Sequence, residues 1–346
     1  MEELTIRPVP RLKGDLVLPG DKSISHRAVM IGAIAKGKTI AKDILDCDDC
    51  NYTIRAFADM GIVIKKESRY TTIEGKGLRG LARPKASLNV GNSGTSMRLL
   101  AGILAGQDFS ATLEGDESLS ARPMKRISEP LALMGVSVNT RDGHPPLEIR
   151  GGNVKAVDYV LPIPSAQIKS ALLFAGLYAA GVTTVRESSK SRDHTERMLE
   201  YFGADIKVEG LNVSVKGGRE LAGRELEVPG DISSASFFMA GAILLDGSKV
   251  RIKNVSINPT RAGVLDILTK MGAKIKIVNK TGLFEPAGDI EVESGPLRGV
   301  SIGEGEIPAA IDELPIIFVL ACLAKGRTVI KGAGELRVKE TDRIRS

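Results

Sequence analysis

The chain has 346 residues, of which 42% are hydrophobic and 26% charged, values typical of a globular protein large enough for two domains. Lys and Arg exceed Asp and Glu by 48 − 42 = 6, an excess that suits acidic small molecules or a nucleic acid. There is no Trp and only 4% of the residues are aromatic. This disfavours a single-strand nucleic-acid binder, because such proteins stack bases on aromatic rings.

The N-terminal residues 1–14 contain no apolar signal segment, and apolar runs such as residues 316–324 are too short to cross a bilayer. Three cysteines are typical of a reducing compartment, and we predict a cytoplasmic protein. Cys47 and Cys50 form a C-x-x-C motif, but no second pair completes a zinc site. We expect the flanking acids to raise rather than lower the thiol pKa values, and we predict no metal or redox function.

One pattern recurs about every 70 residues along the chain. It consists of a strand end, a turn, a helix rich in Ala, Gly and Leu, a glycine and a β-branched strand. The low charge of these helices predicts that they are buried on all sides. The glycines expected to end them are Gly37, Gly106, Gly181, Gly247 and Gly326.

A second helix is predicted after each of these strands, ending in an apolar residue and a capping glycine. These glycines are Gly61, Gly135, Gly203 and Gly272. Each unit is then about 70 residues of alternating strand and helix, which indicates an α/β fold. In a fifth unit the second helix is expected to begin near Thr341, so the pattern predicts a polypeptide truncated or split within that unit.

Polar side chains gather at the N-terminal ends of the first three helices of this pattern. Unpaired N–H groups and the positive end of the helix dipole favour an anion there. Taken singly, each cluster favours simple capping by Ser, Thr or Asn, but three equivalent clusters with cations favour anion binding. The clusters are Lys22, Ser23 and Arg27; Asn92, Ser93, Gly94, Thr95, Ser96 and Arg98; and Ser165, Ala166, Gln167 and Lys169.

Four further segments carry polar groups. Residues 91–96, GNSGTS, lack the Gly-Lys-Ser/Thr ending of a Walker motif, which disfavours nucleotide binding by that route. Arg122 precedes a proline, which predicts an extended turn, and the alternative is an ordinary surface arginine. Asp312 and Glu313 precede an apolar run, either as first-turn carboxylates or as a general base in a partly buried site. Residues 339–343, KETDR, are explained simply by a solvated helix start.

Six stretches resemble the 5-enolpyruvylshikimate-3-phosphate synthase family, in the family's order and over the whole chain. They are PGDKSISHRA from residue 19, GNSGTSMR from 91, ARPM from 121, PSAQIKSALL from 164, IDELP from 311 and RVKETDR from 337. The resemblance implies a two-lobed α/β (α+β) enolpyruvyl transferase fold of repeated βαβαββ units, with five of six present and the fifth incomplete. It assigns residues 19–227 to a first lobe on the shikimate-3-phosphate side, and residues 1–18 and 228–346 to an incomplete second lobe.

The reaction implied by the resemblance transfers the enolpyruvyl group of phosphoenolpyruvate to the 5-hydroxyl of shikimate-3-phosphate and releases phosphate. It belongs to the shikimate pathway, which leads to chorismate and the aromatic amino acids. The implied partners are these two substrates, with no cofactor, nucleic acid or membrane, and a monomer when complete. The family is the target of glyphosate, an anionic competitor of phosphoenolpyruvate. Because further cationic residues of the family lie beyond residue 346, we expect this chain to be inactive by itself.

Residue roles carry over by motif position. The resemblance makes Asp312 the acceptor of the 5-hydroxyl proton, with Glu340 and Lys22 as further catalytic residues. Ala166 stands where some members have Ser, so one side-chain hydrogen bond is lost there. The expected shikimate-3-phosphate ligands are Lys22, Ser23, Arg27, Ser165, Ala166, Gln167, Asp312 and Lys339. The expected phosphoenolpyruvate ligands are Lys22, Gly94, Arg122, Gln167 and Arg343.

Two other functions stay open at this point. UDP-N-acetylglucosamine enolpyruvyl transferase shares the fold, but it has Lys-Asn at the first motif and uses a cysteine in the loop near Arg122. Residues 116–126 of this chain contain no Cys. A basic, repeat-built RNA-binding module would show a steep salt dependence of RNA affinity and no turnover.

Overall fold

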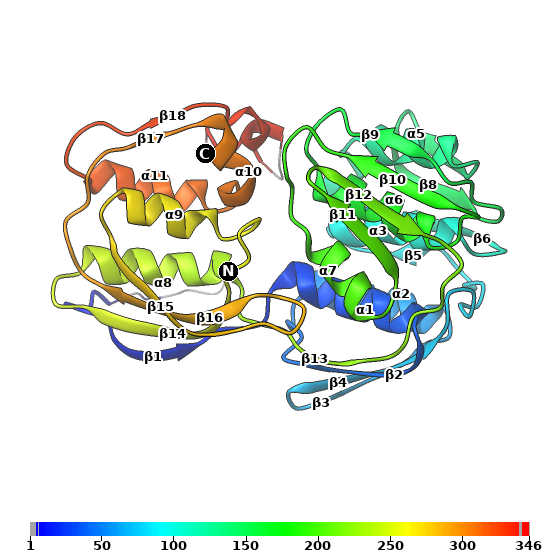
Figure 1. Cartoon of the computed structure of the whole chain (residues 1–346), viewed down its shortest axis with the longest axis horizontal. Helices are drawn as coiled ribbons and strands as arrows, with labels where there is room; N and C mark the ends of the chain where they lie inside the picture. The colour runs from blue at the N-terminus through cyan, green and yellow to red at the C-terminus, as the bar shows by residue number, and fades with distance from the viewer. Residues whose placement is uncertain (1–4, 6, 339–340, 346) are drawn as a thin grey trace. The chain divides into compact units, whose positions relative to one another are not determined.

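The computed structural model describes residue 5, residues 7–338 and residues 341–345. The chain divides into two compact units. Unit 1 comprises residues 1–19 and 229–346, and unit 2 comprises residues 20–228. Unit 1 contains both ends of the chain because strand β1 (Lys13–Val17) pairs in parallel with β14 (Lys249–Ser256), as Figure 1 shows.

Unit 2 contains three four-stranded sheets of one topology, in which a parallel pair of strands is extended by two antiparallel strands. The sheet orders are β13-β2-β4-β3, β5-β6-β8-β7 and β9-β10-β12-β11. This repetition confirms the predicted α/β repeats. The strands are β2 (Lys36–Lys42), β3 (Val63–Glu67), β4 (Tyr70–Lys76), β5 (Leu88–Asn89), β6 (Ser110–Glu114), β7 (Ser137–Arg141), β8 (His144–Arg150), β9 (Asp158–Val160), β10 (Val182–Arg186), β11 (Asp205–Glu209), β12 (Asn212–Lys216) and β13 (Glu225–Glu227).

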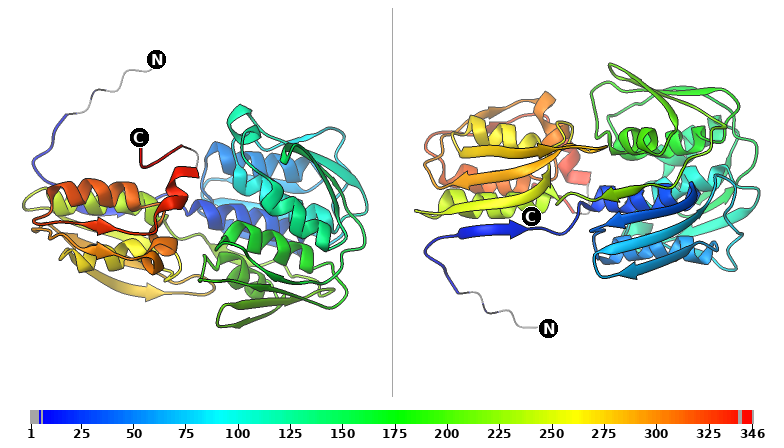
Figure 2. Two further views of the ribbon diagram at one scale, coloured as in Figure 1. Left: turned by 90° about the horizontal axis from the view of Figure 1, so that it is seen from above. Right: turned by 60° about the horizontal axis from the view of Figure 1, so that its bottom comes forward.

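The helices of unit 2 lie together and are covered by its sheets (Figures 1 and 2). In α1 every residue from Ile24 to Ile34 is buried, and α3 and α6 are buried over most of their length. These three helices confirm the predicted burial on all sides. The helices of unit 2 are α1 (Lys22–Ile34), α2 (Asp48–Asp59), α3 (Gly94–Ala105), α4 (Glu117–Ser120), α5 (Lys125–Leu133), α6 (Ala166–Gly176) and α7 (His194–Tyr201).

The prediction of burial on all sides is wrong for the two charge-poor helices of unit 1, α8 (Ile232–Leu244) and α11 (Leu314–Leu323). Phe237 and Phe238 on α8 and Val319 and Leu323 on α11 are exposed, because one face of each helix packs into the core of unit 1 and the opposite face does not.

Unit 1 has one four-stranded sheet, of order β1-β14-β16-β15, and a two-stranded sheet, β17-β18. In Figure 1 the longer helices of this unit lie in a layer between the two sheets. Their apolar side chains form a core with the four-stranded sheet, including Met239, Ile252, Leu268 and Leu320. The remaining elements are α8 (Ile232–Leu244), α9 (Gly263–Lys270), β15 (Lys274–Thr281), β16 (Ala287–Glu293), β17 (Ser301–Ile302), η1 (Glu304–Glu306), α10 (Ile307–Ala310), α11 (Leu314–Leu323), β18 (Val329–Ile330) and η2 (Gly334–Val338).

Glycine positions test the predicted helix ends. Gly61, Gly135, Gly203 and Gly272 each follow the C-cap of a helix with φ between 81° and 97°, which confirms the four predicted capping glycines. Of the other set, only Gly106 caps its helix. The prediction is wrong for Gly37, Gly181, Gly247 and Gly326. These glycines lie two or more residues beyond the helix end and have positive φ. Gly37 already belongs to strand β2, and the other three lie in the turns that lead to the next strand.

Helices α3 and α6 approach each other closely at Gly102. A Cβ at this position would lie 2.1 Å from the carbonyl oxygen of Ala171 on α6. No side chain fits at such a separation. Gly102 therefore lets two helices pack backbone to backbone, and their contact brings the polar residues at the two N-terminal ends together.

We predict that Gly102→Ala lowers the free energy of unfolding by at least about 2 kcal/mol, because the added methyl group forces α3 and α6 apart. The matched control is Gly305→Ala. Gly305 has ordinary φ and open space around the position of a Cβ, so its substitution should change stability by less than about 0.5 kcal/mol. Denaturant unfolding monitored by circular dichroism measures both. Equal stabilities for the two variants would contradict the account of this helix contact.

Candidate functional site

The N-terminal ends of α1, α3 and α6 are each capped by a side chain. Asp21 accepts a hydrogen bond from the N–H of Ile24 at 2.9 Å, and Ser93 accepts one from Ser96 at 3.1 Å. Ser165 caps α6 by accepting from the N–H of Ile168 at 3.4 Å. The capping interpretation is therefore correct for all three helices. Capping by one side chain satisfies only part of the N–H groups of a first turn, so it does not oppose an anion site.

Arg27 is buried on α1, and its guanidinium donates hydrogen bonds to two other helices and to the first turn of α1 itself. Its Nε donates to Oγ1 of Thr195 on α7 at 2.6 Å, and its Nη2 donates to Oγ of Ser170 on α6 at 3.0 Å. Its Nη1 donates to the carbonyl of Ser23 at 2.9 Å, one turn earlier on α1. Ser170 and Thr195 are also hydrogen-bonded to each other at 2.6 Å. These contacts hold one guanidinium at a fixed place beside the first turns of α1 and α6.

Gln167 connects the first turns of α6 and α3. Its Oε1 accepts from Nη1 of Arg98 at 2.7 Å, and its Nε2 donates to Oγ1 of Thr95 at 3.1 Å. The structure therefore brings together Gln167 and two members of the predicted cluster on α3. Ala166 is the first residue of α6, and its carbonyl accepts from Oγ of Ser170 at 2.6 Å.

Gly94 lies between two guanidinium groups. A Cβ at Gly94 would lie 2.8 Å from Nη1 of Arg98 and 3.3 Å from Nη1 of Arg122. Arg122 donates from Nη2 to Oδ1 of Asn92 at 2.5 Å, and Asn92 in turn donates to the carboxylate of Asp116. Arg122 is thus not a detached surface arginine, and the two cations make the start of α3 a positively charged surface.

Lys22 begins α1, and its side chain is half exposed. Its Nζ lies 3.1 Å from Oδ2 of Asp49 on α2. Burial disfavours the charged form of Lys22, but the nearby Asp49 carboxylate outweighs it and raises the pKa. Lys22 is therefore a protonated, accessible cation beside Ser23.

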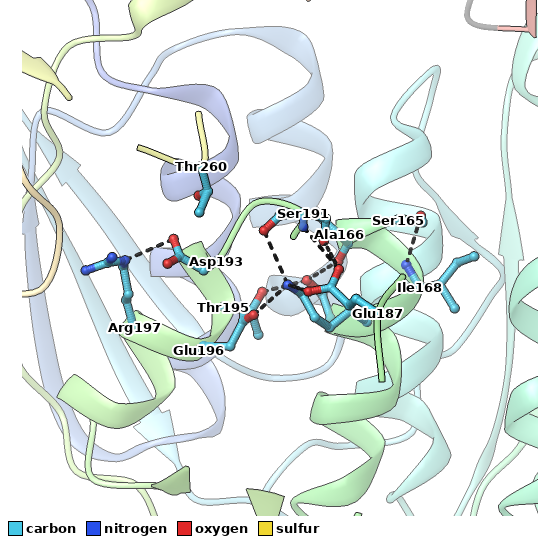
Figure 3. Close-up of polar contacts among 12 residues, drawn as sticks. Ser165, Ala166, Ile168, Glu187, Ser191, Asp193, Thr195, Glu196, Arg197 and Thr260 are labelled. Atoms are coloured by element: carbon cyan, nitrogen blue, oxygen red, sulfur yellow. Dashed lines mark hydrogen bonds and ion pairs between the residues drawn. The ribbon is translucent and has the colours of Figure 1, made fainter. Parts of the chain in front are cut away.

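Lys169 does not belong to an anion site, and its assignment to the third cluster is wrong. Its side chain is buried, with Nζ 2.7 Å from Oε2 of Glu187 and 2.7 Å from Oε1 of Glu196. Its Nζ also lies 3.5 Å from the carbonyl oxygen of Ser191. Figure 3 shows Glu187, Ser191 and Glu196 converging on these contacts. The side chain points away from the first turn of α6 and joins α6 to α7 and to the loop before it.

Burial and charge act in opposite directions in this cluster. Burial disfavours the ammonium form of Lys169, but Glu196 and Glu187 raise its pKa overall. Burial also raises the pKa of Glu196, and this effect outweighs the opposite effect of Lys169. The cluster holds the polar loop before α7, and Thr195 on α7 contacts Arg27.

His26 is fully buried next to Arg27 on α1. Its Nδ1 lies 2.7 Å from Oγ1 of Thr53 on α2, and Thr53 lies 2.7 Å from Oγ of Ser96 on α3. Ser96 donates to the capping hydroxyl of Ser93 at 2.7 Å. Burial, with Lys22 and Arg27 as further causes, lowers the pKa of His26 to about 3. A neutral histidine therefore connects α1 through α2 to the first turn of α3.

In unit 1, Asp312 and Glu313 have different surroundings. Oδ1 of Asp312 lies 3.2 Å from Nη1 of Arg343, and both side chains are about one quarter exposed. Glu313 is buried immediately before α11, with Oε1 2.6 Å from Nη1 of Arg261, and Ser233 also contacts both of these groups. Of the two acids, Asp312 is the accessible one. The predicted site residues Lys339 and Glu340 lie outside the described residues.

Sequence reasoning missed the residues that hold the predicted ligands. These are Asp49 beside Lys22, and Ser170 and Thr195 around Arg27. One signal was present for Thr195. Residues 193–196 read Asp-His-Thr-Glu and form the N-cap and first turn of α7, a polar helix start like those of α1, α3 and α6.

A separate cavity of about 440 Å³ lies on the sheet β5-β6-β8-β7 of unit 2. Its lining includes Lys85, Ser87, Ser110, Asn139 and Arg150. It contains none of the predicted site residues. Because it opens on strands and loops, it also lacks the N–H groups of a helix start.

Within the described part of the chain, no three His, Cys, Asp or Glu side chains are grouped so as to hold a metal ion. None of the described helices has both the length and the apolar character needed to cross a membrane.

Comparison with known proteins identifies the family. Residues 6–346 match the family model of EPSP synthase, 3-phosphoshikimate 1-carboxyvinyltransferase. The chain belongs to the EPSP synthase family. The 3-phosphoshikimate 1-carboxyvinyltransferase of Bacillus licheniformis is 52% identical over 339 residues, which cover 97% of this chain and 79% of the relative. That of Geobacter metallireducens is 50% identical over 347 residues, which cover 99% of this chain and 81% of the relative.

Solved structures agree with the family assignment. An EPSP synthase from Acinetobacter baumannii is 48% identical, with a TM-score of 0.89, and the match covers 97% of this chain and 77% of that one. The enolpyruvyl transferase NikO from Streptomyces tendae is 18% identical, with a TM-score of 0.72 over 92% of this chain and 76% of that one, and shares the fold. The resemblance to the EPSP synthase family and the predicted fold class are confirmed. The roles of the individual site residues stay predictions.

We predict that the buried cluster around Lys169 is a structural requirement of this EPSP synthase family member. Lys169→Met leaves Glu187 and Glu196 buried without their cation and should lower the free energy of unfolding by about 3–5 kcal/mol. The control Lys190→Met, at an exposed lysine of the same loop, should change it by less than about 0.5 kcal/mol. The triple variant with Glu187→Gln and Glu196→Gln added to Lys169→Met should regain part of the lost free energy of unfolding. A Lys169→Met single variant as stable as the wild type would contradict this prediction.

We predict a pH dependence of stability from His26. The folded protein keeps His26 neutral down to about pH 3, whereas the unfolded chain binds a proton below about pH 6.5, so the free energy of unfolding decreases as the pH falls from about 6.5. Between pH 7 and pH 4 this group should contribute a loss on the order of 3 kcal/mol. Denaturant unfolding at both pH values measures it. His26→Asn keeps a partner for Thr53 without a titrating ring, and the same pH dependence in this variant would refute the assignment.

Proposed function

We propose that the protein to which this chain belongs catalyses the 3-phosphoshikimate 1-carboxyvinyltransferase reaction, in which shikimate-3-phosphate receives the enolpyruvyl group of phosphoenolpyruvate. The inactivity of residues 1–346 by themselves stays a prediction. Curated relatives at about 50% identity over nearly the whole chain carry this activity in their names. The observation that carries the proposal is the match of residues 6–346 to the EPSP synthase family, together with cations at the helix N-termini of unit 2. The match favours this function over the UDP-N-acetylglucosamine enolpyruvyl transferase and the RNA-binding module.

Shikimate-3-phosphate is proposed to bind at the first turns of α1 and α6. Ser23, Ser165 and Gln167 are close to the N–H groups of these turns, which favour an anion. Arg27 is held by Ser170 and Thr195 beside the same turns and supplies positive charge. Phosphate needs such charge-assisted hydrogen bonds once it leaves water. Lys339, in unit 1, is proposed as a further ligand.

Phosphoenolpyruvate is proposed to bind next to the first turn of α3. Gly94 leaves space between Arg98 and Arg122, where a carboxylate or phosphate oxygen would meet two guanidinium groups. Lys22, Gln167 and Arg343 are proposed to complete the ligand set.

The proposed chemistry requires groups that move protons. The 5-hydroxyl adds to the enol carbon while the methylene carbon is protonated, and the tetrahedral intermediate then loses phosphate. Asp312 is proposed as the acceptor of the hydroxyl proton. Its Oδ1 lies 3.2 Å from Nη1 of Arg343, so a cation stands beside the proposed base. Glu340 is proposed as the second acid or base. The absence of a cofactor, the monomeric state and the cytoplasmic location stay predictions.

The function is tested by substrate-dependent phosphate release and by binding. Phosphate release from phosphoenolpyruvate should require shikimate-3-phosphate. Calorimetric titration of the chain should show binding of shikimate-3-phosphate at least tenfold tighter than of unphosphorylated shikimate, since the phosphate makes the charge-assisted contacts. Equal affinities for the two compounds, or phosphate release that ignores shikimate-3-phosphate, would contradict the proposal.

We predict that Asp312→Asn keeps substrate affinity and lowers turnover by roughly 10²–10⁴-fold. The amide is nearly isosteric with the carboxylate but cannot accept the hydroxyl proton. Asp266→Asn, at an exposed position on α9, is the matched control and should leave turnover unchanged. The turnover number is measured from the rate of phosphate release by the active protein. If Asp312→Asn turned over as fast as the wild type, Asp312 would not be the acceptor of the hydroxyl proton.

A further prediction concerns glyphosate. It should inhibit competitively with phosphoenolpyruvate, and Gly94→Ala should weaken both ligands, because the new methyl group would displace the guanidinium of Arg98 and crowd that of Arg122. Affinity for shikimate-3-phosphate serves as the internal control and should stay within about twofold of the wild type. A Gly94→Ala protein with unchanged glyphosate inhibition would show that neither ligand approaches this glycine.

A further inference from the structure

The C-x-x-C motif lies at the beginning of helix α2. Cys47 is the N-cap, with φ −147° and ψ 163°, and Cys50 is the third residue of the helix. The carbonyl of Cys47 accepts the first helical hydrogen bond, from the N–H of Asn51 at 2.9 Å. Side chains at the N-cap and at the third helical position face each other across the first turn. The fold therefore brings the two thiols of the motif together.

The two thiols have different environments. Cys50 is fully buried, whereas Cys47 is partly exposed. A hydrogen bond from the Cys50 thiol lowers the pKa of Cys47 to about 6, and the same hydrogen bond, with burial, raises the pKa of Cys50. The expectation that the flanking acids raise both values is wrong for Cys47, because the effect of Asp49 is outweighed. Such an unequal pair matches the requirements for thiol–disulfide exchange, with an accessible thiolate and a protected second thiol.

A cation of the candidate site is close to this pair. Lys22 binds Asp49, which lies between the two cysteines in the sequence, with an Nζ–Oδ2 distance of 3.1 Å. Asp49 is the main group that raises the pKa of Lys22, and Cys47 and Cys50 raise it further by smaller amounts. A change in the charge of Cys47 therefore reaches the electrostatic environment of Lys22 directly.

We propose that Cys47 and Cys50 form a dithiol–disulfide site that reacts with small-molecule disulfides such as oxidised glutathione. The Cys47 thiolate attacks one sulfur of the small disulfide, forming a mixed disulfide and releasing one thiolate. Cys50 then gives up its proton and attacks the sulfur of Cys47, releasing the second thiol. The protein dithiol is oxidised by two electrons and the small disulfide is reduced to two thiol products. The first product leaves as a thiolate and takes a proton from the solvent, and the second leaves with the proton that Cys50 gives up.

Oxidation also changes the charge beside Lys22, and this second part rests on the proposed function. In the reduced protein the Cys47 thiolate is an anion near Lys22, and it opposes the approach of an anionic substrate. The disulfide is neutral, so oxidation should tighten the binding of shikimate-3-phosphate. For a partly exposed charge pair the expected effect is about two- to fivefold in affinity.

Mass spectrometry of the whole chain tests the disulfide. The protein is equilibrated with oxidised glutathione, quenched in acid, alkylated and digested with trypsin. The peptide spanning residues 43–55 holds both cysteines. We expect this peptide without alkyl groups and lighter by the mass of two hydrogen atoms. Cys50→Ser should instead accumulate a glutathione mixed disulfide at Cys47, and Cys322→Ser should behave as the wild type. Full alkylation of residues 47 and 50, under conditions that modify the exposed Cys322, would overturn the proposal.

Calorimetry with shikimate-3-phosphate tests the link to Lys22. Oxidised wild type and reduced Cys47→Ser both lack the thiolate charge, and both should bind two- to fivefold more tightly than reduced wild type. Equal affinities, with the disulfide formed, would overturn the link to Lys22. Absence of binding in all three proteins, with the disulfide still formed, would instead count against the proposed function.

Discussion

The candidate site in unit 2 depends on one buried guanidinium. Arg27 lies on a helix that is buried from Ile24 to Ile34, and a cation is stable there only when its N–H groups find acceptors. Ser170 of α6 and Thr195 of α7 provide two of them. These contacts join α6 and α7 to α1 close to their first turns. The same helix starts expose the N–H groups that favour an anion, so the constraint that stabilises Arg27 also shapes the site.

The other features of unit 2 support this arrangement. Gly102 allows α3 to approach α6 at backbone distance, and Gln167 then reaches both Arg98 and Thr95. Lys169 holds the loop before α7, from which Thr195 follows. A buried ion cluster contributes little net stability compared with apolar packing, but it fixes one geometry, because breaking it leaves charges without partners. Precise placement of charged ligands is what anion recognition and proton transfer require.

The repeat, the burial of α1, α3 and α6 and four capping glycines followed from periodicity and from the conformational freedom of glycine, which are local properties. The polar clusters at the helix starts were also visible in the sequence. Local pattern could not separate Arg27 from Lys169, since both follow a polar first turn. Arg27 contacts Thr195 across 168 residues of sequence, whereas Lys169 reaches Glu187 and Glu196. These long-range partners place Arg27 beside the candidate site and Lys169 in a buried ion cluster. A periodic sequence pattern contains no information about such partners.

The central claim is that unit 2 binds an anion at the first turns of α1 and α6. Hydrogen–deuterium exchange of the whole chain, with and without shikimate-3-phosphate, tests it directly, because free N–H groups of a helix start exchange readily until a ligand accepts their hydrogen bonds. The account predicts slower exchange in peptides that contain residues 22–27 and 165–168, and unchanged exchange in residues 84–87 and 148–150 around the separate cavity. Slower exchange confined to that cavity, with none at the two helix starts, would contradict it.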